Sequence, residues 1–220
     1  MSRLVWDKTG ERFYETGTKQ AVLYPQSNGT YPKGVAWNGF SAFTLSPSGA
    51  EATPIYADDI KYLNLMSAEE IGATVEAYTY PDEFDECNGI VSVASGVTVA
   101  QQTRKAFGLC VKTTVGNDVD FNDHGYKLHI LYNALASPSE KAYQAVNDSP
   151  ETVTFSWELT TTPIEVTGYK PTAYMCIDSR TVPAEKLKAL EDILYGSDDE
   201  EARLPLPDEI ISTIGTKTVG

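Results

Sequence analysis

The sequence is poor in the residues on which disulfides, metal sites and catalysis usually depend. Its 220 residues include only three cysteines and two histidines. Cys87, Cys110 and Cys176 are widely spaced and odd in number, which predicts reduced, mostly buried thiols instead of a disulfide framework. With no CxxC pair and so few histidines, the sequence indicates no metal site of the zinc type. We expect no cofactor.

Long apolar runs and basic residues are also scarce. No stretch of about 18 uncharged apolar residues occurs, so we expect no membrane partner. The first residues lack the apolar core of a signal peptide, which predicts synthesis and folding in a cytoplasm. The chain has 17 basic and 31 acidic residues, a net charge of −14. Such a surface repels nucleic-acid phosphates and argues against tight nucleic-acid binding, although solubility alone explains the charge equally well.

Catalytic signatures are missing. The most enzyme-like cluster consists of Asp118, Asp120, Asp123 and His124. Oxygen-rich loops of this kind can bind Ca²⁺, and the sequence leaves open whether these aspartates bind a cation. Their spacing fits no EF-hand, and residues 116–125 equally predict a polar turn between two strands, which we favour. No GxSxG motif or phosphate loop occurs. We therefore expect a protein without enzymatic activity and without a catalytic or metal-binding residue.

Much of the chain alternates with a period near two residues, the mark of half-buried strands. The pattern is plainest from Val153 onward, where one face is predicted to carry Val153, Phe155, Trp157 and Leu159. A similar alternation covers residues 74–80. Further strands are predicted at 34–45, 90–93, 107–115, 126–134 and 173–178, and the many Tyr, Val and Thr residues suit a pleated sheet.

Helix signals are few. A capping serine and a proline predict a short helix over residues 137–146. A second helix is predicted from Pro183 to Tyr195, with Leu187, Leu190 and Leu194 on one face and Gly196 at its end. Strands with so few helices predict a mainly β fold: an antiparallel β-sandwich or barrel-like sheet with one or two flanking α-helices.

Several segments, in order along the chain, resemble the major tail tube proteins of long-tailed, siphovirus-type bacteriophages. The resemblance spans roughly residues 34–178. Each piece is short, and their order makes the match specific. The pieces are residues 34–41, 55–62, 73–81, 84–89, 126–133 and 154–163.

This resemblance implies a structural virion protein that polymerises as stacked hexameric rings into a tail tube. Such a tube conducts double-stranded DNA without binding it specifically during ejection into the host. The implied partners are other copies of the chain, a tape measure protein inside the tube, and tail terminator and distal tail proteins. The implied location is the virion tail, assembled in the bacterial host cytoplasm.

The resemblance also suggests how the chain is divided. We expect an N-terminal arm over residues 1–24, a tail tube β-domain with its helix over 25–195, and an acidic C-terminal arm over 196–220. The candidate loop to the next ring is Ser46, Pro47, Ser48, Gly49, Ala50 and Glu51. Glu76 and Glu158, which alternate with apolar neighbours, are the candidate lumen-facing acids. A negative lumen repels phosphate, which gives the net charge a mechanical purpose.

Two other functions stay open from the sequence. One is a non-catalytic β-sandwich that binds carbohydrate or another ligand, because three tryptophans and thirteen tyrosines offer aromatic platforms, although such residues more often fill cores. The other is a cation-dependent hydrolase that uses the Asp118 to His124 cluster.

Overall fold

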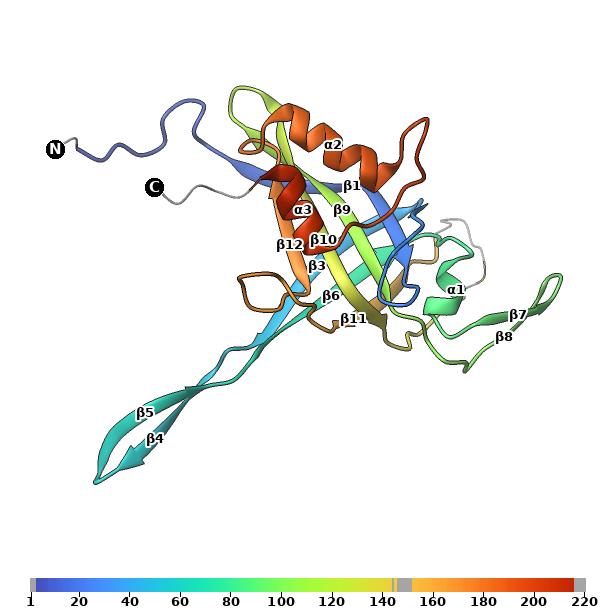
Figure 1. Ribbon diagram of the computed structural model, residues 1–220, viewed down its shortest axis with the longest axis horizontal. Coiled ribbons are helices and arrows are strands. Elements are labelled where there is room, and N and C mark those ends of the chain that lie inside the picture. Colours follow the sequence, from blue (N-terminus) through green and yellow to red (C-terminus); the bar gives the residue numbers. More distant parts are fainter. Residues whose placement is uncertain (1–2, 144, 146–151, 216–220) are drawn as a thin grey trace.

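The computed structural model describes residues 3–143, 145 and 152–215. Most of the strands join one antiparallel sheet, in the order β2-β1-β9-β10-β11-β6-β3, with β12 paired to β10 beside this path (Figure 1). Its strands are β1 (Tyr14–Pro25), β2 (Val35–Ala36), β3 (Phe40–Gly49), β6 (Glu69–Ala77), β9 (Phe107–Asn117), β10 (Phe121–Ala136), β11 (Phe155–Thr161) and β12 (Tyr174–Asp178). Two further pairs, β4 (Ala52–Ala57) with β5 (Ile60–Met66) and β7 (Val91–Ala94) with β8 (Val97–Val99), form separate hairpins. The predicted mainly β, sandwich-like fold is confirmed, and across the described residues the sheet is curled but not closed.

The long strand β10 changes partners at Asn133 and so bends the sheet. Residues Lys127–Leu131 pair with β12, whereas Ala134–Ala136 pair with β11. Asn133 has a positive φ of 48°, a conformation that asparagine tolerates better than most residues. It lies where the register between β10 and β9 shifts. Its side-chain oxygen accepts hydrogen bonds from the Gln26 amide and, at 3.4 Å, from the Tyr31 hydroxyl. This bend brings β11, β6 and β3 over the other half of the sheet.

The inner face of the curled sheet encloses the first core. Alternate residues of β9, β10 and β11 point inward, among them Leu109, Leu131 and Trp157, all fully buried. Aromatic rings fill one end: the ring centroids of Trp37 and Phe84 lie 4.7 Å apart, and those of Phe84 and Trp157 lie 5.0 Å apart. Edge-to-face and tilted packing of this kind is favourable beyond simple burial.

The outer face of β1, β9, β10 and β12 carries the second core, which two helices cover (Figure 1). The helices are α2 (Ala184–Tyr195) and α3 (Pro207–Ile214), while α1 (Phe84–Cys87) is a short turn at the inner core. Leu187, Leu190 and Leu194 of α2 are buried against the sheet, as predicted from their spacing. Within the described residues, no helix is both long and apolar enough to cross a membrane.

Most predicted strands are confirmed, and the second helix is confirmed over Ala184–Tyr195, with Gly196 in the positive-φ region at its end. Residues 137–143 and 145, which belong to the first predicted helix, contain no helix, so that prediction is wrong there; positions 144 and 146 lie outside the described residues. Tertiary contacts override the local signal. The Ser137 N–H donates to the Glu158 carbonyl oxygen at 2.8 Å, and Lys141 Nζ donates to the Tyr80 hydroxyl at 2.8 Å.

Parts of the two segments expected as arms belong to the folded body. Residues 14–24 of the expected N-terminal arm belong to strand β1, which lies between the edge strand β2 and β9. In the expected acidic C-terminal arm, Leu204 is buried and α3 packs on the second core.

Two cysteines, Cys87 and Cys110, are buried as predicted, whereas Cys176 is exposed, and all three are free thiols.

Candidate assembly surfaces

A two-stranded arm projects far from the body of the protein (Figure 1). It continues from the paired ends of β3 and β6 through the β4–β5 hairpin to a turn at Asp58 and Asp59, both with positive φ. An isolated two-stranded hairpin is at best marginally stable in water. The arm therefore has the form of a segment that packs against another molecule.

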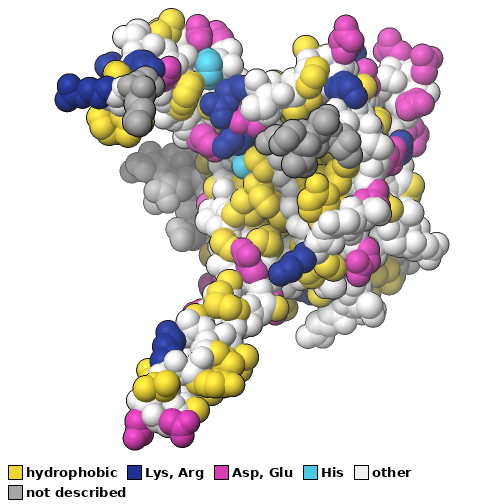
Figure 2. All heavy atoms as spheres, turned by 60° about the vertical axis from the view of Figure 1, so that its left-hand side comes forward, with side chains coloured by type: hydrophobic (Ala, Val, Ile, Leu, Met, Phe, Trp, Pro, Cys, Tyr) yellow, Lys and Arg dark blue, Asp and Glu magenta, His cyan; other side chains and the backbone are white. Residues whose placement is uncertain are grey.

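One face of this arm is almost entirely apolar. Thr53, Ile55 and Ala57 alternate along β4 and share one face, and their partners Leu65, Leu63 and Ile60 lie opposite them across a one-residue register shift in β5. Leu65 exposes 55% and Ile60 66% of its surface. Figure 2 shows hydrophobic side chains covering the arm and acidic side chains at its tip. A large exposed apolar surface on a projecting element marks an interaction site.

The residues predicted as the inter-ring loop lie at the root of this arm. Ser46, Pro47, Ser48 and Gly49 belong to β3 and pair with Gly72, Ile71, Glu70 and Glu69 of β6. Only Ala50 and Glu51 lie in the connection to β4. The segment is therefore strand for most of its length, because β6 supplies a partner that its Ser- and Pro-rich composition did not indicate.

A second hairpin, β7–β8, projects at the opposite end of the molecule (Figure 1). Its exposed apolar side chains are Val91, Val93, Val97 and Val99. The sequence predicted only its first strand. The signal that marks the whole hairpin is the absence of any charged residue from Cys87 to Thr103, in a chain that is 22% charged.

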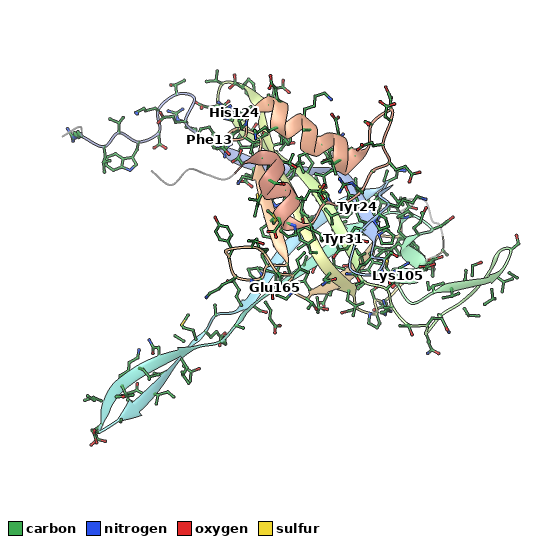
Figure 3. All side chains as sticks on the ribbon, viewed as in Figure 1. Phe13, Tyr24, Tyr31, Lys105, His124 and Glu165 are labelled. Carbon is green, nitrogen blue, oxygen red and sulfur yellow. The ribbon has the colours of Figure 1, made fainter. Side chains whose placement is uncertain are left out.

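The base of the β7–β8 hairpin is held firmly. The Gln102 N–H donates to the Gly89 carbonyl oxygen at 3.0 Å, and Arg104 donates to Asn88 Oδ1 at 3.1 Å and to the Ala136 carbonyl oxygen at 2.9 Å. Lys105, labelled at this base in Figure 3, pairs with Glu86 at 3.0 Å. The direction in which the hairpin points is thus fixed by the body of the protein.

Glu76 and Glu158, the predicted lumen-facing acids, lie on one sheet face. Glu76 pairs with Ser156, and Glu158 pairs with Thr74, so all four side chains point away from the inner core. Glu158 is exposed and Glu76 is half-buried. Strands β3, β6 and β11 contain no lysine or arginine. The face is therefore polar, and the charged side chains that these strands contribute to it are all acidic.

The Asp118 to His124 cluster is a turn that anchors the N-terminal segment. Strand β9 ends at Asn117 and β10 begins at Phe121, which confirms the predicted turn between strands. Asp118 accepts the Gly10 N–H at 3.0 Å and pairs with Arg12 at 3.6 Å. Phe13 stacks on His124 with ring centroids 5.2 Å apart (Figure 3). Among the described residues, no group of three or more His, Cys, Asp or Glu side chains is arranged to hold a metal ion.

His129 of β10 is a buried polar residue of the main sheet. Its Nε2 shares a hydrogen bond with Thr113 Oγ1 at 2.8 Å, and its Nδ1 shares one with the Tyr174 hydroxyl at 2.7 Å. Burial lowers the pKa of His129 below its ordinary value. Both ring nitrogens are therefore occupied by packing partners in the folded chain. The cleft of about 400 Å³ next to it is lined mainly by small and polar residues of β1 and β3.

No protein-family model and no curated protein sequence matches this chain. Among solved structures, it is similar to a chain of the six-fold symmetrised baseplate of the anti-feeding prophage, with 14% identity and a TM-score of 0.36, over 80% of this chain and 97% of that chain. It is also similar to a chain of the extended sheath–tube complex of PVC, an extracellular contractile injection system, with 11% identity and a TM-score of 0.34, over 72% of this chain and 88% of that chain. Both similarities are too distant to decide family membership or function.

Proposed function

We propose that this protein is a structural subunit of a phage-type tail tube, which assembles with copies of itself into stacked six-fold rings. The observation that carries the proposal is the β4–β5 arm, whose apolar face is exposed in the single chain. Burying apolar surface stabilises by about 25 cal/mol per Å². A projecting hairpin of this kind gains its stability from a neighbouring subunit.

The sheet face that carries Glu76 and Glu158 suits the wall of a DNA conduit. Along β3, β6 and β11 this face has hydroxyl and carboxylate groups but no lysine or arginine that could bind a phosphate. Acidic side chains repel the DNA backbone, so DNA passes without adhering. In this proposal the face lines the lumen, the arm at residues 46–71 contacts the next ring, and the implied tape measure, terminator and distal tail proteins are the remaining partners.

A carbohydrate-binding module is less well supported by the positions of the tryptophans. Trp37 and Trp157 are buried in the inner core, at 3% and 0% exposure, and so offer no platform for a sugar ring. Only Trp6, in the N-terminal segment, is exposed, at 73%. We propose no catalytic role, since His129 and the turn at Asp118 serve packing contacts.

Electron microscopy and sedimentation velocity of the purified full chain, over a range of concentrations, test the proposal. Hollow tubes or six-fold rings are the expected result. The variant Ile55→Ser, Leu63→Ser, Leu65→Ser should remain a folded monomer, whereas the control Tyr143→Ser, Tyr169→Ser, which removes exposed aromatics that are not part of the arm, should assemble normally. A chain that stays monomeric at every concentration, or an arm variant that assembles like the wild type, contradicts the proposal.

A further inference from the structure

The β7–β8 hairpin is an exposed element without charged residues in the part of the chain that the structure describes. Among the described residues each strand has a single partner, so each has an edge of backbone N–H and C=O groups that is not paired within them. Proteins normally guard such edges with charged residues or proline. Here neither occurs between Cys87 and Thr103, and the exposed side chains include four valines, Val91, Val93, Val97 and Val99. Its strands are short and their register shifts between Ser92 and Ala94, which limits pairing at the edges, so the exposed valines form the candidate contact surface.

The charge of the whole chain indicates what covers the hairpin. Two copies of a subunit with a net charge of −14 repel each other over most of their surface. They approach without that cost only where charge is missing. The β7–β8 hairpin and the apolar face of the β4–β5 arm both meet this condition, and they lie at opposite ends of the molecule (Figure 1).

We infer that the β7–β8 hairpin is the acceptor for the β4–β5 arm of a second copy of this chain, an inference that rests on the proposed function. The apolar face formed by Ile55, Ile60, Leu63 and Leu65 packs on the valines. Because donor and acceptor are different surfaces on opposite ends, the contact is head-to-tail and propagates along a stack. Pairing of two β7–β8 hairpins with each other would instead close a two-fold dimer.

Cross-linking between substituted positions tests the pairing. In a Cys176→Ser background, which removes the exposed native thiol, the double variant Leu63→Cys, Val93→Cys is treated with a short bismaleimide. Each subunit then has one reactive donor and one reactive acceptor, so the expected product is a ladder of covalent oligomers. Circular dichroism establishes that the variant is folded.

Two controls make the outcome decisive. The single variants should give no ladder, and Leu63→Cys with Tyr169→Cys, an exposed position in the connection between β11 and β12, should also give none. Dimers from Val93→Cys alone, or tubes in the microscope without a ladder, would overturn the inference and leave the proposed function standing. A chain that stays monomeric in sedimentation and gives no ladder would overturn both.

Discussion

The hydroxyl of Tyr24 in β1 donates a 2.6 Å hydrogen bond to the carbonyl oxygen of Leu194 near the end of α2. Both residues are fully buried in the second core. The bond satisfies a carbonyl that the helix end would otherwise leave without a partner. The first strand and the second helix are thus joined inside the second core; Tyr24 is labelled in Figure 3.

Tyr24→Phe should lower stability by about 1–3 kcal/mol, because the buried Leu194 carbonyl loses its donor. For a chain of this size, this corresponds to a fall in melting temperature of roughly 2–4 °C per kcal/mol. Thermal unfolding followed by circular dichroism measures the change. The control Tyr169→Phe, at a side chain that is 75% exposed, should change stability by less than about 0.5 kcal/mol. Equal effects of the two substitutions would contradict the role of the Tyr24 hydroxyl.

Stability should fall as the pH is lowered from about 7 to about 5, because of His129. Burial, the largest effect, lowers its pKa in the folded chain, with opposing contributions from the nearby charges of Glu15 and Lys127. The unfolded chain therefore binds the proton more readily. The contribution of His129 is complete above the unfolded value of about 6.5 and is lost as the pH falls through the folded pKa.

The matched variant for this prediction is His129→Gln, whose amide can still bond to Thr113 and Tyr174 but does not titrate. Melting temperatures measured at several pH values should show a flatter slope for this variant between about pH 5 and pH 7. An unchanged slope would assign the pH dependence to other groups.

Gly89→Ala should destabilise the base of the β7–β8 hairpin. Gly89 has a φ of +73°, and an added Cβ would approach the Gln102 carbonyl oxygen to 2.9 Å. Gly96→Ala, at the tip, has a similar φ of +75° but nothing within 4 Å of the added atom. Both changes carry the backbone penalty. Limited proteolysis should therefore cleave the Gly89 variant near this hairpin faster than the Gly96 variant, and equal rates would exclude the steric effect.

Glu158→Lys should leave tubes intact and slow DNA ejection, more at low salt than at high salt, because a lysine in the lumen attracts phosphate and salt screens the attraction. The control is Glu165→Lys, which makes the same charge change at an exposed position in the connection after β11 (Figure 3). Ejection kinetics from particles that carry each variant provide the measurement. If both variants eject DNA like the wild type at both salt concentrations, Glu158 does not line the channel.

Local patterns in the sequence were sufficient for most of the sheet and for α2. The alternation that ends in Trp157 and Leu159 placed the buried face of β11 correctly, because side chains of a strand alternate between its two faces whatever the partner strand is. The leucines of α2 and Gly196 likewise defined a helix by spacing and by a backbone conformation that favours glycine.

Long-range contacts decided what those patterns left open. Strand β1 was missed because its burial comes from pairing with β9, which lies far away in the sequence. The sequence marked only the root of the arm as a contact segment, and Ser46–Gly49 form a strand there because they pair with β6. The helix expected near residue 140 was replaced in its described part by contacts of Lys141 with Tyr80 and of Ser137 with β11.

The sequence by itself determined an acidic, strand-rich chain in which catalytic signatures are missing, because charge, residue type and alternation are local properties. Only the tertiary structure decided which apolar residues stay outside the core. Val91 and Leu65 have the same apolar character as Val75 and Leu131, but the first pair is exposed on hairpins and the second pair is fully buried. Burial depends on which strands pair in the main sheet, and in the described part of the chain that pairing leaves two apolar hairpins outside the main sheet.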